Sequence, residues 1–176
     1  MARHARDGGA ADAQPMTMPP RLRNLVLVVH VASSVGMLGA VASFLALAII
    51  GLVMPDGGLA RAAYLAMKAI AWLVIVPLIL AALLVGIAES LATPWGLFRH
   101  WWVVAKLVLT VVATVVLLLQ MNLIDGVAAF ASAAALPPAL GQARMALVLH
   151  SGGGLVVLIV AVVLSVYKPR GRTLYA

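Results

Sequence analysis

The sequence predicts an all-α protein built as a bundle of four transmembrane helices. The first observation behind this fold is composition, since 65% of the 176 residues are hydrophobic and only 10% are charged. Soluble domains average roughly 45–50% apolar and about 25% charged residues. The second is four long runs almost free of charge, each of the order of 20 residues that crosses a bilayer. The third is that most of the twelve Lys and Arg residues lie at the edges of these runs.

The same composition excludes several classes of protein. A soluble fold of this size has more surface than so few charges could cover, which argues against a water-soluble enzyme, a nucleic-acid-binding protein and a disordered chain. The net charge of +7 instead fits topology signals and headgroup anchors. The chain has no cysteine, which excludes disulfides and Cys-ligated clusters, zinc or haem.

The first 24 residues are predicted to form a disordered cytoplasmic tail, because they are polar and hold three prolines and four arginines. The first span is predicted at residues 25–54, thirty residues without a formal charge at neutral pH. Ala40-Val41-Ala42 resembles a signal-peptide cleavage site, but the apolar run continues well beyond it. Because the apolar part of a signal peptide has only about 7–15 residues, an uncleaved first helix is expected.

The second span is predicted at residues 62–90, after a turn at Pro55-Asp56-Gly57-Gly58. Pro77 lies inside this span and is expected to kink it, as membrane helices tolerate proline. A break is expected at Thr93-Pro94-Trp95-Gly96, because the residue before a proline disfavours the helical conformation.

The third span is predicted at residues 100–124, an apolar run interrupted by Lys106. An Ala-rich loop, with a short surface helix as an open alternative within it, is expected to follow over residues 125–144, and the fourth span over residues 145–167. Residues 168–176 complete the chain as a second cytoplasmic tail. Residues 25–167 are thus predicted to form a single four-helix membrane domain.

The distribution of basic residues predicts the orientation of the bundle. Four spans place both termini on one side, where the tails and the second loop with its flank carry nine Lys and Arg residues against three in the other two loops. The positive-inside rule then places both termini in the cytoplasm. The predicted location is a bacterial cytoplasmic (inner) membrane.

Two segments carry a family resemblance. Thr93-Pro94-Trp95-Gly96-Leu97-Phe98-Arg99-His100-Trp101-Trp102 is followed by Lys106-Leu107, and His150-Ser151-Gly152-Gly153-Gly154 leads to Ser165-Val166-Tyr167-Lys168-Pro169-Arg170-Gly171. Over roughly residues 24 to 173 the chain resembles a family of small bacterial four-span predicted integral membrane proteins without an assigned function. This resemblance implies the fold and no catalytic residues. A lesser likeness, through a His early in an apolar helix followed by small residues, is to the membrane part of copper resistance protein D.

Polar side chains in membrane helices are costly, so each one is a candidate functional residue. His30, Glu89 and His100 share one predicted layer near the cytoplasmic face, and their side chains are suitable ligands for a divalent metal ion. In the structural alternative Glu89 pairs with Arg99 or Lys106, and His30 bonds a backbone carbonyl or Ser34 on its own helix.

A b-type haem is a second cofactor hypothesis, because four-helix bundles often carry a cofactor between facing helices. The candidate axial ligands are His30, His100, His150 and Met121. At ~1.5 Å rise per residue His30 and His150 are separated by about 15 Å along the membrane normal. Matching depth therefore favours His30 with His100, or His150 with Met121.

Two further patterns concern the helix faces. Small residues that let helices approach closely are predicted to make packing surfaces, at Ala32, Gly36 and Ala40 and at Gly152, Gly153 and Gly154. A polar stripe on the third span is predicted to face the bundle interior, because its members lie within about 120° of arc at ~100° per residue. The stripe consists of Lys106, Thr110, Thr114 and Gln120.

These observations favour a non-enzymatic membrane protein acting as an accessory or interaction subunit. The chain has no nucleotide-binding loop, no HExxH motif and a single Glu. A haem- or metal-binding redox protein using His30, His100 or His150 is the first alternative, and a small oligomeric transporter is the second. The expected partners are the lipid bilayer and either another membrane protein or further copies of this chain, with no nucleic acid.

Overall fold

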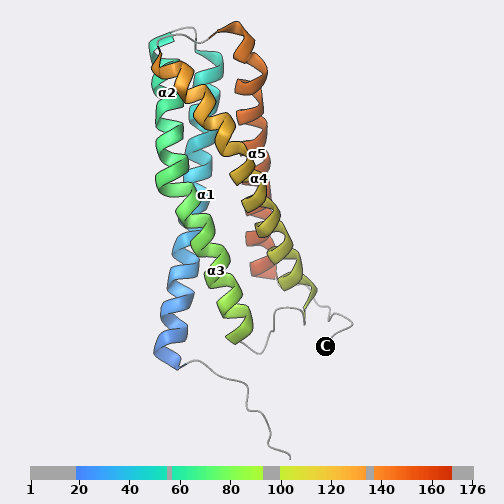
Figure 1. The fold of residues 1–176 in the computed structure, drawn as a ribbon. Helices are drawn as coiled ribbons and strands as arrows, with labels where there is room; N and C mark the ends of the chain where they lie inside the picture. The colour runs from blue at the N-terminus through green and yellow to red at the C-terminus, as the bar shows by residue number, and fades with distance from the viewer. Residues whose placement is uncertain (1–18, 55–56, 93–99, 134–136, 168–176) are drawn as a thin grey trace, which may run out of the picture.

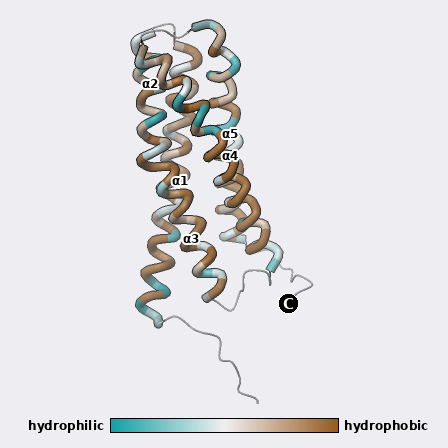
Figure 2. Tube along the Cα trace, viewed as in Figure 1, coloured by the Kyte–Doolittle hydropathy of each residue, from teal (hydrophilic) through white to brown (hydrophobic). Residues whose placement is uncertain are grey.

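The computed structural model describes residues 19–54, 57–92, 100–133 and 137–167. These residues form four helical spans, each long and apolar enough to cross a membrane (Figure 1). Apolar residues cover most of their length, as Figure 2 shows. The predicted all-α fold with four transmembrane helices is therefore confirmed.

The first span is helix α1, Pro20–Val53. It begins earlier than predicted, so that residues 20–24 are helical rather than part of a tail. Pro20 occupies the start of the helix, where its missing N–H is not needed and its fixed φ angle suits the helix. Pro19 is the N-cap residue of this helix. Residues 1–18, residues 168–176 and the predicted break at Thr93-Pro94-Trp95-Gly96 lie outside the described residues.

The second span is one continuous helical rod with an irregular middle. It consists of α2, Gly57–Ile70, a π-helical turn η1, Ala71–Ile75, and α3, Val76–Ala92. The backbone N–H of Val76 bonds the carbonyl oxygen of Ala71, five residues earlier. Pro77 has no N–H, and its ring would collide with a carbonyl of the preceding regular turn. The wider π turn directly before it lets the helix continue past the proline.

The third and fourth spans are longer than predicted. Helix α4 covers Trp101–Ser132, and a short 3-10 turn, η2, Pro138–Leu140, leads into α5, Gly141–Tyr167. The prediction of a loop over residues 125–144 is therefore wrong for most of that segment. Alanine is the strongest helix former, which explains why an Ala-rich stretch extends α4 rather than leaving it.

Each helix of the bundle packs against two neighbours. Helix α1 lies between α2/α3 and α5, and α4 lies between the same two neighbours on the other side. The start of α1, the end of α3, the start of α4 and the end of α5 meet at one end of the bundle (Figure 1). We call this the termini end and the other the far end.

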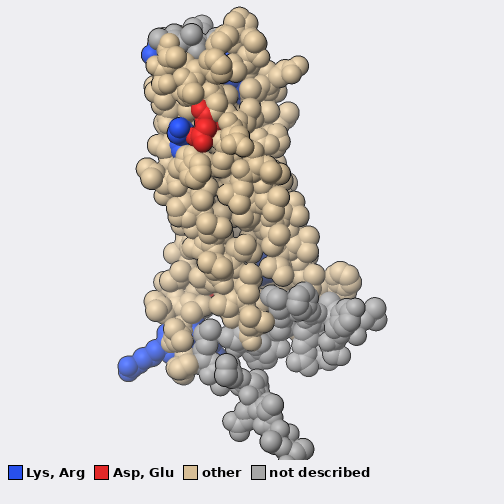
Figure 3. Space-filling model, in the orientation of Figure 1, with Lys and Arg blue, Asp and Glu red and all other residues tan. Residues whose placement is uncertain are grey.

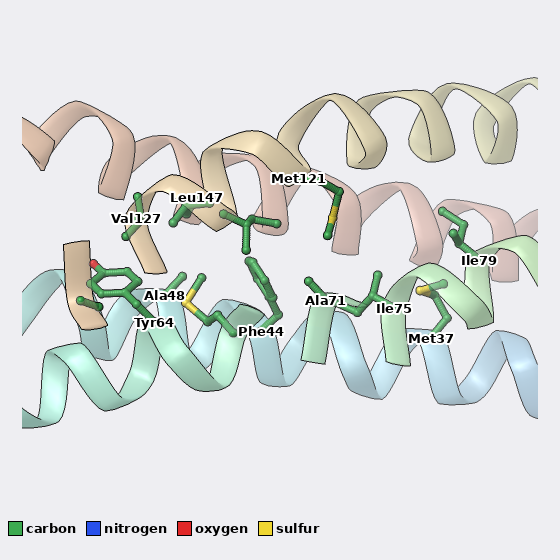
Figure 4. Packing of buried hydrophobic residues seen from close by; sticks show 13 residues of the cluster. Met37, Phe44, Ala48, Tyr64, Ala71, Ile75, Ile79, Met121, Val127 and Leu147 are labelled. Carbon is green, nitrogen blue, oxygen red and sulfur yellow. The ribbon is translucent and has the colours of Figure 1, made fainter. Parts of the chain in front are cut away.

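Packing is unequal along the bundle. The buried apolar cluster lies toward the far end, where Phe44, Tyr64, Met121, Val127 and Leu147 interlock (Figure 4). Toward the termini end, α5 has no fully buried residue after Ser151. Lipid supplies no hydrophobic force between helices, so side-chain contact must hold them together. The far half is therefore the tightly held half of the bundle.

Candidate functional site

The loosely packed half contains a cavity of about 400 Å³ between α1, α3, α4 and α5. We call it the cleft. Its volume lies within the roughly 300–1,000 Å³ typical of small-molecule sites. Most of its wall is apolar, and the polar minority comprises His30, Ser34, Glu89, Ser90, Lys106, Thr110 and Ser165.

His30 is the polar residue of this set with a buried side-chain atom that lacks a partner. Its Nδ1 atom is buried without a hydrogen-bond partner. The hydroxyl of Ser34 donates to the backbone carbonyl of His30 at 2.8 Å and does not reach the ring. Gly86 lies beside the ring, since a Cβ atom there would be 3.2 Å from His30 Cε1. Because buried polar atoms are nearly always hydrogen-bonded, this nitrogen marks a place for a partner.

Glu89 and Lys106 line the cleft from α3 and α4. The ammonium of Lys106 lies 4.7 Å from the centre of the Trp102 ring, within the range of a cation–π interaction. Among the described residues the ion pair within 4.0 Å is that of Lys68 and Asp125, so Glu89 and Lys106 do not form the predicted pair. Arg99, the other predicted partner of Glu89, lies outside the described residues.

The three residues proposed as metal ligands do not gather in one place. His100 directly precedes α4, where its ring centre lies 6.3 Å from that of Trp102. His30 and Glu89 line the cleft, and His100 does not. Within the described ranges no three His, Asp or Glu side chains are grouped so that they could hold a metal ion.

His150 lies on α5 and lines a second cavity rather than the cleft. Its Nδ1 is 2.6 Å from the carbonyl oxygen of Ala146, and its Nε2 is 3.2 Å from the amide nitrogen of Gln120. The carbonyl can only accept, so Nδ1 carries the proton and Nε2 accepts from Gln120. Both ring nitrogens are thus engaged, whereas Met121, its proposed haem partner, belongs to the buried apolar cluster.

Each residue of the polar stripe of α4 is buried or lines one of two cavities. Lys106 and Thr110 line the cleft, Thr114 is buried, and Gln120 lines a second cavity. The hydroxyls of Thr110 and Thr114 each donate to the carbonyl four residues earlier, at 2.8 and 2.7 Å. Their protons therefore satisfy the helix backbone, a common habit of Thr in helices.

The second cavity has a volume of about 340 Å³ and extends toward the far end. It shares wall residues with the cleft, among them Met37, Ile79 and Leu158. Its lining is almost entirely apolar, and its polar side chains include Gln120 and His150. The two cavities thus adjoin one another along the bundle, and both open partly to its surface, since Val35 of the cleft wall and Leu149 of the second wall are exposed.

Of the three small residues predicted to pack α1 against a neighbour, one makes a close contact between helices. A Cβ atom at Gly36 would lie 3.3 Å from Leu78 Cδ1, which supports packing of α1 on α3 there. Ala32 is exposed and Ala40 is partly buried against the core.

The three consecutive glycines do not form the predicted close contact. Gly152 and Gly153 have open space where a Cβ atom would be, and only Gly154 approaches a neighbour, Val41, at 4.0 Å. Besides Gly36, the tight glycines are Gly51 and Gly86, which were not among the predicted packing residues. No sequence signal separates them from the others, because the contact comes from a different helix.

Two arginines close the far end of the bundle, and the sequence did not single them out. The Arg61 Nε–H donates to the carbonyl of Ala131 at 2.9 Å, near the end of α4. Arg144 donates to the carbonyls of Gly51 and Leu52 near the end of α1. The last carbonyls of a helix lack partners within it, so each arginine caps a helix other than its own.

An ion pair joins α2 to α4 on the surface near the far end. Lys68 Nζ lies 3.1 Å from Asp125 Oδ1, and the Trp72 indole donates to the same oxygen at 3.2 Å. Few charges interrupt the otherwise uncharged face in Figure 3. Asp125, which was predicted to start a loop, is thus accommodated within α4.

No protein-family model matches this chain. No curated protein and no solved structure matches it either. The cleft, with the unpartnered nitrogen of His30, is the candidate binding site of this protein.

Proposed function

We propose that this protein is a non-enzymatic integral membrane protein, an accessory or interaction subunit, that binds a small molecule in the cleft. The buried Nδ1 of His30, without a hydrogen-bond partner and beside a cavity of about 400 Å³, carries this proposal. An unpaired buried polar atom costs roughly 1–3 kcal/mol. A ligand that bonds this nitrogen and fills the apolar remainder of the cleft would recover that cost.

The hydroxyl groups in the cleft support a binding role over a catalytic one. Ser34, Ser90, Thr110 and Ser165 each donate to a carbonyl oxygen four residues earlier on their own helix. A hydroxyl nucleophile needs an adjacent base that takes its proton. These protons are directed at backbone carbonyls instead.

The proposed location is a bacterial cytoplasmic membrane with both termini in the cytoplasm. The nine basic residues on the side of the termini against three on the other support this orientation. The resemblance to small bacterial four-span membrane proteins supports the bacterial origin. The cleft would then lie in the cytoplasmic half of the bilayer.

The test compares small molecules that co-purify with three forms of the protein in mild detergent. Ser34→Trp places an indole in the cleft, whereas Ser43→Trp places one at an exposed site on the same helix, outside it. Mass spectrometry of the extracts should find a compound with the wild type and with Ser43→Trp that Ser34→Trp has lost. Identical extracts from all three forms, with unchanged melting temperatures, would refute binding in the cleft.

The same preparation tests the haem alternative. An axial pair on facing helices is required, and His30 is the histidine that the described cleft wall provides. A Soret band in the absorption spectrum of the wild type that is lost in His30→Phe would favour the redox protein. A preparation without a Soret band that retains another compound would favour a non-enzymatic binding protein.

A further inference from the structure

We infer that the ligand of the cleft is a single-chain amphiphile with a small, uncharged, hydrogen-bonding head. The head lies among His30, Glu89 and Lys106, and the chain extends into the second cavity. This inference rests on the proposed function and specifies its ligand class.

The spacing of polar residues places the head at the edge of the hydrocarbon layer. Lys106 and Asp125 are 19 positions apart on α4, about 29 Å at the helical rise. Lys68 and Glu89 are 21 positions apart on the α2–α3 rod, about 32 Å by the same rise. The hydrocarbon core of a bilayer is about 30 Å thick. The polar layers at Glu89 and Lys106 and at Lys68 and Asp125 therefore match its two boundaries, where lipid heads lie.

We place the chain along the two adjoining cavities. The cleft and the second cavity share Met37, Ile79 and Leu158, and both have mainly apolar walls. From Lys106 to Gln120 the path covers 14 positions of α4, about 21 Å. One leaflet contributes only about 15 Å of the hydrocarbon core. Together the two cavities are thus long enough for a chain that starts at the boundary and passes the bilayer centre.

The charges around the head position favour an uncharged group. Lys106 and Glu89 bring opposite formal charges to the same cleft. A carboxylate head attracted by Lys106 would also lie beside the carboxylate of Glu89, and an ammonium head attracted by Glu89 would also lie beside the ammonium of Lys106. Such like-charge contacts are costly where the dielectric constant is low. A hydroxyl or carbonyl head avoids both and can bond the Nδ1 of His30.

The experiment measures binding of defined amphiphiles by native mass spectrometry of the full-length protein. The probes are monopalmitoylglycerol, palmitate and hexadecyltrimethylammonium, which carry comparable chains with uncharged, negative and positive heads. Monopalmitoylglycerol should bind at least about tenfold more tightly than either charged probe, a factor that corresponds to ~1.4 kcal/mol. A long-chain benzoquinone, whose head is also uncharged and polar, shows whether a quinone is the better source of this chemistry.

Matched glycine variants test the chain path. Gly153 lines the second cavity and Gly152 does not, and at neither residue would a Cβ atom have a neighbour within 4 Å. Gly153→Leu should weaken binding of monopalmitoylglycerol at least about tenfold, because the new side chain occupies space that several methylene groups would fill. Gly152→Leu should leave it unchanged. Melting temperatures of both variants show whether the fold is retained.

Two results would overturn this inference while leaving the proposed function intact. One is equal binding of all probes; the other is unchanged binding to a folded Gly153→Leu variant while Ser34→Trp still loses its co-purifying compound. If Ser34→Trp also retains that compound, binding in the cleft itself is refuted. Loss of binding in Gly153→Leu alone, with the expected preference among heads, supports the inference.

Discussion

The guanidinium of Arg144 donates a hydrogen bond from Nε to the hydroxyl of Tyr64 at 2.8 Å, and so links the start of α5 to the buried face of α2. Tyr64 is only 1% exposed. The same guanidinium donates through Nη2 to Gly51 and Leu52 of α1. One side chain thus joins three spans, and its charge lies at the C-terminal end of α1, where the helix dipole favours a cation.

Removal of this cation should destabilise the bundle more than removal of its phenolic partner. Arg144→Met leaves carbonyls at the end of α1 and the Tyr64 hydroxyl without their donor, and we expect a loss of at least about 2 kcal/mol. Tyr64→Phe leaves the other bonds of Arg144 in place and should cost about 1 kcal/mol. Unfolding of the detergent-solubilised variants measures both. A larger loss in Tyr64→Phe than in Arg144→Met would contradict this account.

Gly51 should not accept even a methyl group. A Cβ atom there would lie 2.5 Å from Tyr64 Cζ, and the buried ring is held by Arg144. Gly51→Ala should therefore destabilise the protein by about 1–3 kcal/mol, the usual cost of overpacking. Gly126→Ala is the matched control, since nothing lies within 4 Å of its Cβ position. Equal melting temperatures for the two variants would show that the α1–α2 contact is looser than described.

Two double-mutant cycles should give different coupling energies. Lys68 and Asp125 form an ion pair whose side chains are 48% and 36% exposed, so Lys68→Met and Asp125→Asn should couple by about 0.2–1 kcal/mol. Glu89→Gln and Lys106→Leu should be additive, because these two described residues form no ion pair with each other. Unfolding free energies of the single and double variants provide both values. Coupling at Glu89 and Lys106 that exceeds the other pair would reverse this assignment.

Reporter fusions should locate both ends of the chain in the cytoplasm. A reporter that is active only in the cytoplasm should be active after Ala176, and one that is active only in the periplasm should be active when inserted at Ala134. The reason is that nine basic residues lie on the side of the termini and three on the other side. A C-terminal fusion active only in the periplasm would reject this orientation.

The four spans could be predicted from the amino-acid sequence alone, because membrane helices must be long and apolar. The polar stripe of Lys106, Thr110, Thr114 and Gln120 could be recognised in the sequence, since polar groups avoid lipid, and of these residues Thr114 is buried. The error at residues 125–144 arose from Asp125. A charged residue followed by glycine is typical of a turn, but the pair with Lys68 across two helices keeps this one inside α4.

Which apolar surfaces meet could be learned only from the packed bundle. In a membrane protein the lipid-facing residues are as apolar as the buried ones, so hydrophobic periodicity does not show which face is internal. The contact of Gly51 with Tyr64, the space beside Gly153 and the cleft around His30 all depend on how neighbouring helices approach one another. The interior of this protein is therefore determined by contacts between segments that sequence patterns treat as equivalent.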